Sequence, residues 1–152
     1  MKTLLILIAL ALPAAARIGE TPEECIARYG QPMADMPAGV MAFTKAGFRI
    51  ALLFHQGRAE GISVSKMETN ILKNSLPMSE AEITAVLDAN GAGKKWKESG
   101  AGFTGRSWES EDGSRFAGYD KTKNHLNLYT KAWADRTGAE QAEAERKNLD
   151  GF

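Results

Sequence analysis

The sequence has a single cysteine, only two histidines and no excess of charge, with 19 basic and 19 acidic side chains. One cysteine cannot form a disulfide within the chain, and so few cysteines and histidines do not provide the paired spacing of a tetrahedral zinc site. A balanced charge argues against nucleic acid as a main partner, because binding to phosphates needs a surplus of basic residues. We therefore expect no metal, no cofactor and no nucleic-acid partner.

Long hydrophobic runs are also missing, with one exception near the N-terminus. Leu4 to Leu12 contains nine residues without a polar group, far short of the roughly 20 that a transmembrane helix needs. Lys2 precedes this run and Ala14-Ala15-Ala16 follows it, which is the charged, apolar and small-residue layout of a secretory signal peptide. We predict that residues 1–16 are removed on export. Residues 17–152 then form one domain without a transmembrane span, in the bacterial periplasm or outside the cell.

Two short helices are predicted from capping signals at their N-termini. Thr21 with Glu24, and Ser79 with Glu82, have the spacing of capping boxes. A glycine, which tolerates the left-handed backbone that often ends a helix, follows each of the two segments. The expected ends are at Gly30 and Gly91.

Alternating apolar residues and turn signals after each helix predict a three-stranded meander. Ala46-Gly47 and Gln56-Gly57 are expected to be turns in the first meander, and Asp112-Gly113 and residues 121–124 in the second. The expected strands are Val40–Lys45, residues 48–54 and 62–64, then Arg106–Glu111, Arg115–Asp120 and Leu126–Trp133.

This order predicts an α+β fold of two tandem helix-plus-three-strand repeats, at about 19–67 and about 78–134. The repeats would share one antiparallel sheet of about six strands with the helices on one face. Residues 43–66 and 108–131 can be aligned without a gap, although several inward positions slip by one. A β-sandwich with peripheral helices is the alternative fold.

A third helix is expected at about 137–149, because Thr137 and Glu140 have the spacing of another capping box. Its apolar face is thin, so it should lie on the surface.

Cys25 is the residue most open to a chemical role. Counted from the N-caps, Cys25 and Ile83 occupy the same position in the two predicted helices, which favours a small core side chain over a reactive thiol. The alternative is a nucleophile paired with His55.

Other catalytic motifs are absent or incomplete. No Gly-x-Ser-x-Gly elbow is present, and Gly91 to Lys95 lacks the residues of a phosphate-binding loop. Glu109 and Glu111 share one predicted strand face. Paired carboxylates hydrolyse glycosides in other proteins, but a solvated strand face is the usual reason for such a pair. We expect no catalytic residues.

Three aromatic side chains are harder to place in the predicted core. Trp96 stands among lysines, Phe103 lies in a glycine-rich stretch and Trp133 follows the last predicted strand. Aromatic residues beside loops are typical anchors at binding surfaces. The alternative is that they close the ends of the sheet.

The short capped helix followed by a meander resembles the small outer-membrane assembly lipoproteins of the SmpA/OmlA type, and the β-lactamase inhibitory proteins carry this unit twice. Gly19 to Pro32 carry the resemblance, and Ser79 to Gly91 more loosely. Arg17 to Thr21, Cys25 and residues 28–30 are also similar to uncharacterised exported bacterial proteins. The chain lacks the lipid-bearing cysteine of the lipoproteins and the paired cysteines of the inhibitors. What the resemblance implies is a binding or scaffolding role.

The sequence therefore favours an exported, non-enzymatic binding or scaffolding domain that acts on another cell-envelope or extracellular protein. The alternatives are a small hydrolase that uses acidic residues or Cys25, and a binder of small ligands on the concave face of the sheet.

The signal peptide can be tested by the mass of the exported protein. We expect a mature N-terminus at Arg17, because small residues occupy the positions before that bond. Intact-mass measurement should show the loss of residues 1–16. Full-length protein retained in the cytoplasm would contradict the prediction.

Overall fold

The computed structural model describes residues 17–149 except 71, 72, 74, 103 and 104. The predicted signal peptide and Phe103 lie outside the described residues. Within the described part of the chain, no helix is long and apolar enough to cross a membrane.

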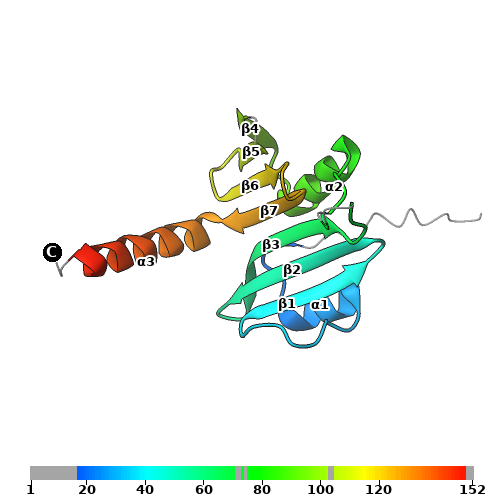
Figure 1. Cartoon of the computed structure of the whole chain (residues 1–152), viewed down its shortest axis with the longest axis horizontal. Coiled ribbons are helices and arrows are strands. Elements are labelled where there is room, and N and C mark those ends of the chain that lie inside the picture. The colour runs from blue at the N-terminus through cyan, green and yellow to red at the C-terminus, as the bar shows by residue number, and fades with distance from the viewer. Residues whose placement is uncertain (1–16, 71–72, 74, 103–104, 150–152) are drawn as a thin grey trace, which may run out of the picture.

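The fold is α+β with one antiparallel sheet, as predicted, but the sheet has seven strands in the order β1-β2-β3-β7-β6-β5-β4 (Figure 1). One strand, which follows α2 within the second predicted repeat, was not expected. The elements are α1 (Pro22–Tyr29), β1 (Val40–Lys45), β2 (Phe48–His55), β3 (Arg58–Lys66), α2 (Glu80–Asn90), β4 (Trp96–Ala101), β5 (Gly105–Ser110), β6 (Arg115–Asp120), β7 (His125–Thr130) and α3 (Lys131–Leu149).

The capping boxes predicted for the first two helices both form. Thr21 accepts the N–H of Glu24 in α1, and Ser79 accepts the N–H of Glu82 in α2, while each glutamate bonds back to its cap. These bonds satisfy backbone donors that the first turn of a helix leaves unpaired.

The two helix ends differ. Gly30 has a positive φ of 89°, which glycine tolerates. Gly91 has an ordinary right-handed backbone. It is needed for space instead, because a Cβ at this position would lie 2.5 Å from the carbonyl oxygen of Lys94.

The unexpected strand β4 forms the edge of the sheet beside β5. All of its residues except Trp96 are exposed, so it lacks the alternation that identifies a half-buried strand. A register shift between Glu98 and Gly100 interrupts its pairing. Such a bulge makes an edge strand a poor template for further strands.

The predicted start of the third helix is wrong. Helix α3 begins at Lys131, directly after β7, and not near residue 137. Thr130 acts as the cap, since its hydroxyl accepts the N–H of Trp133 at 3.1 Å. Thr137 lies inside the helix and donates to the carbonyl of Trp133. Because Thr130 caps the helix, β7 ends at this residue and not at Trp133, where the apolar pattern placed its end.

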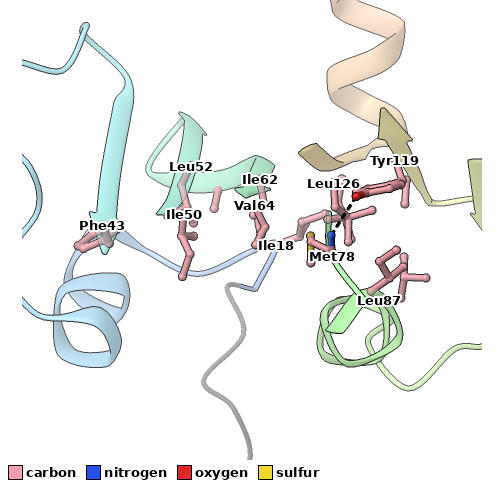
Figure 2. Close-up of a cluster of buried hydrophobic side chains, with 14 of the residues drawn as sticks. Ile18, Phe43, Ile50, Leu52, Ile62, Val64, Met78, Leu87, Tyr119 and Leu126 are labelled. Atoms are coloured by element: carbon pink, nitrogen blue, oxygen red, sulfur yellow. Dashed lines mark hydrogen bonds between the residues drawn. The ribbon is translucent and has the colours of Figure 1, made fainter. Parts of the chain in front are cut away.

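Helices α1 and α2 cover the same face of the sheet, and their buried residues join one hydrophobic cluster with the inward residues of the strands (Figure 2). Tyr29 of α1 packs on Phe43, with ring centroids 5.2 Å apart. Over the other half of the sheet, the hydroxyl of Tyr119 accepts the N–H of Met78 at 3.0 Å. Ile18 lies between the two halves.

The ungapped alignment of the two halves does not hold through the last strands. Leu52 pairs with Ile62 in the first half, whereas Ala117 pairs with Leu128 in the second, which requires one more residue between the strands. Without a gap, buried Ile62 would fall on exposed Asn127.

Asn90, at the end of α2, is a buried polar residue that ties three parts of the chain together. Its Oδ1 accepts the N–H of Ile18 at 2.8 Å, its Nδ2 donates to Val86, and its carbonyl accepts from Arg115. The side chain is 0% exposed, so its bonds replace water completely. It holds the N-terminal segment on the core.

We expect Asn90→Ala to lower the free energy of unfolding by about 1–3 kcal/mol, because the N–H of Ile18 would remain buried without its acceptor. Urea unfolding measures the change. Asn127→Ala, at an exposed position, is the matched control and should change it by less than about 0.5 kcal/mol. Equal changes in the free energy of unfolding of the two variants would show that the buried side chain of Asn90 does not stabilise the fold.

Candidate functional site

Cys25 lies in the core and is 0% exposed. Its Sγ is 3.7 Å from Oε2 of Glu20, and the other oxygen of this carboxylate accepts from Arg28 Nε at 2.7 Å. Burial raises the pKa of the Cys25 thiol to about 12, and the negative charge of Glu20 adds to this effect. The thiol is therefore protonated at neutral pH and shielded, which is the opposite of an activated nucleophile.

Glu111, one of the two acidic residues singled out from the sequence, bonds to the backbone of the fold. Glu111 Oε2 accepts the backbone N–H of Lys95 near the end of β5. In the described part of the chain, no group of three or more His, Cys, Asp or Glu side chains could hold a metal ion.

The face of the sheet opposite α1 and α2, here called the open face, carries a continuous row of small side chains. Strand register places one residue of each strand in this row, next to core residues such as Leu52 and Ile62 that point the other way. We call it the small-residue row. Its members, from β1 to β4, are Ala42, Ala51, Ser63, Asn127, Gly118, Ser107 and Gly100.

Beside the small-residue row, the open face carries three aromatic rings that pack on one another in tilted contacts. Phe116 and Tyr129 are register partners with ring centroids 5.8 Å apart. Trp133, from the first turn of α3, packs on Tyr129 at 5.1 Å. All three are only partly buried, and we call them the aromatic stack. Such partly exposed, mutually supported rings are well suited to anchor a partner.

Two hollows lie along the small-residue row because small side chains leave space between larger neighbours. One, of about 580 Å³, includes Gly118, Asn127, Tyr129 and Asp120. The other, of about 600 Å³, we call the basic groove. Its floor is formed by residues from the sheet. Its walls are formed by Met33, Lys66, Met67, Thr69, Lys73 and Ser75. The floor residues are Thr44, Arg49, Ala51, Ser63, Ser65 and His125.

The three aromatic residues singled out from the sequence have different positions. Trp96 is partly buried against the core, and its indole N–H donates to the carbonyl of Leu87 at 2.6 Å, so it closes the end of the sheet. Trp133 belongs to the aromatic stack, and Phe103 lies outside the described residues. The structure does not bring Trp96 and Trp133 together in one contact.

Phe116 and Tyr129 were missed as candidate binding residues. The alternation of buried and less buried residues along β6 and β7 could have identified them. Phe116 precedes buried Ala117 and Tyr129 follows buried Leu128, so both rings point away from the core. An aromatic side chain at an outward position is the feature to look for. Their contact depends on the pairing of β6 with β7.

Comparisons with known proteins give little further guidance. No protein-family model and no curated protein matches the chain. The crystal structure of a cysteine-rich secretory protein from Staphylococcus aureus subsp. aureus Mu50 is similar at 11% identity with a TM-score of 0.41. The match covers 76% of this chain and 45% of that one, so the chain spans less than half of that protein. A likeness of this size does not assign a function.

Burial of Cys25 leads to a prediction about its reactivity. We expect thiol reagents to label the native protein slowly and the denatured protein rapidly, because the folded chain shields the side chain and disfavours its thiolate. The time course of labelling by an aromatic disulfide reagent, with and without urea, measures both rates. Rapid labelling of the native protein would restore Cys25 as a candidate nucleophile.

Proposed function

We propose that the chain is an exported, non-enzymatic binding domain that engages another cell-envelope or extracellular protein through its open face. The observation that carries this proposal is the aromatic stack beside the small-residue row. Helices α1 and α2 cover the other face of the sheet. On the open face, the partly exposed rings of the aromatic stack lie next to the small-residue row.

The dimensions of the row suit an extended segment of a partner chain. Ala42, at the β1 end of the row, is buried, so the accessible part runs from Ala51 on β2 to Gly100 on β4. Five spacings between neighbouring strands amount to about 24 Å at ~4.8 Å each. An extended peptide of roughly seven residues has this length. It would run across the strands and bind by side-chain contacts, with an apolar residue against the aromatic stack.

Other features support the same proposal. The resemblance to outer-membrane assembly lipoproteins implies a binding or scaffolding role, and the signal-like segment at residues 1–16 supports export. We also retain the proposal of tandem repeats, with β4 as an addition to the second repeat. The pairing of β3 with β7, the last strand of each repeat, supports it because it sets the two units side by side.

A small hydrolase is a weaker proposal, because Cys25 is buried and its pKa is raised. A small-ligand binder is the second candidate, and the volume and polar lining of the basic groove favour it.

The proposal can be tested by photo-crosslinking in intact cell envelopes. A photoreactive phenylalanine replacing Asn127, in the small-residue row, should give a specific protein adduct. The same residue replacing Thr84, which is exposed on α2, is the matched control and should not. Trp133→Ala should weaken the interaction by about thirtyfold, corresponding to about 2 kcal/mol, because a partly buried aromatic anchor would be lost.

Thermal unfolding must show that the Trp133→Ala variant remains folded. Adducts that are equally strong from positions 84 and 127, or that are unchanged by Trp133→Ala, would contradict the proposal. An adduct lost in this folded variant would support it.

A further inference from the structure

The basic groove is positively charged although the chain as a whole is neutral. Its lining contains Arg49, Lys66, Lys73 and His125 and no carboxylate, whereas the complete sequence has equal numbers of basic and acidic residues. The local excess is therefore a feature of the fold, which brings residues from β2, β3, β7 and the segment after β3 to one place.

Two of the basic side chains in the groove have no ion-pair partner in the described part of the chain. Lys66 Nζ forms an ion pair with Glu82 at 3.1 Å. Among the described residues, Arg49 and Lys73 have no carboxylate partner. Arg49 is exposed on the open face, and its guanidinium group can offer two parallel donors to one oxyanion.

The nearest acidic residue in the sheet register is Asp120, opposite His125. It lines the neighbouring hollow and not the basic groove. Its Oδ1 accepts bonds from Thr122 and Lys123, so this carboxylate is held by its own turn. It does not neutralise the groove directly.

A serine in the floor of the groove provides a second, independent observation. Ser65 is only 6% exposed and lines the groove. Within the described residues its hydroxyl has no hydrogen-bond partner, and its oxygen is not among the fully buried side-chain atoms that lack one, so it is open to the space of the groove. Ser65 is the register partner of Arg49, so this hydroxyl and the guanidinium group rise from adjacent positions of neighbouring strands.

The wall of the groove is held in place by contacts to the rest of the fold. Thr69 and Ser75 form a β-bridge within the wall segment. The carbonyl of Ser75 accepts from Asn124 Nδ2 at 2.7 Å, which fastens the wall to the turn between β6 and β7. A site that is already shaped loses less entropy when a ligand binds.

We propose that the basic groove binds an anionic group, a phosphate or a carboxylate, carried by a small organic molecule. Arg49 supplies the charge-assisted hydrogen bonds, Ser65 donates its free hydroxyl from the floor, and Lys73 and His125 border the anion. The volume of about 600 Å³ exceeds the size of a bare oxyanion, so the rest of the molecule occupies the remaining space. This inference does not rest on the proposed protein partner.

Titration followed by amide chemical shifts tests the proposal, with inorganic phosphate and acetate as separate probes. Sodium chloride keeps the ionic strength constant, so that general screening does not mimic binding. We expect saturable shifts at the amides of Arg49, Ser63, Ser65 and His125 in at least one of the two series. The probe that binds more tightly shows whether the groove prefers a phosphate or a carboxylate.

Two variants and one control make the test specific. Arg49→Gln should weaken binding of the effective probe about tenfold or more, and Ser65→Ala about threefold to tenfold. Arg58→Gln is the matched control, because Arg58 is an exposed arginine outside the groove. Thermal unfolding establishes that each variant is folded. Absence of saturable shifts with both probes, or binding that persists unchanged in Arg49→Gln, would overturn the proposal.

Discussion

The pairing of β3 with β7 is the interaction on which the rest of the structure depends. Only residues 61–64 and 126–129 take part in this ladder, yet it joins the strands that follow α1 to those that follow α2. Its inward residues Ile62 and Leu128 are almost completely buried. Separated, the halves would be small sheets with incomplete cores, which are marginally stable in water. The pairing therefore creates both the common core and a face that extends across all seven strands.

The two faces of this sheet have different roles. One is covered by α1 and α2 and carries the inward side chains of the hydrophobic core. The other carries small and polar residues in register, so that hollows remain between the larger side chains. The basic groove and the aromatic stack are both products of this asymmetry. Neither belongs to a single segment of the chain, since each depends on residues that are brought together by strand pairing.

The sequence predicted the α+β fold and those local features whose signals are unambiguous, but not the register across the whole sheet. The capping boxes at Thr21 and Ser79 and the positive-φ turn at Ala46-Gly47 depend on near neighbours and were predicted. Strand β4 was missed because an exposed edge strand has no apolar alternation. The start of α3 was misplaced because Thr130 and Thr137 are both plausible caps, and only the structure selects the first. The small-residue row depends on register between all the strands, which spacing alone does not specify.

Burial of Cys25 makes the redox state of the chain depend on its folding equilibrium. A mixed disulfide can form only when the thiol becomes accessible, so its rate of formation in an oxidising solution scales with the population of opened molecules. A typical stability of about 5–15 kcal/mol keeps this population very small. The chain has no second cysteine, so an intramolecular disulfide cannot compete for the exposed thiol. A substitution that destabilises the core would therefore increase the amount of covalent dimer linked by a disulfide between two copies of Cys25.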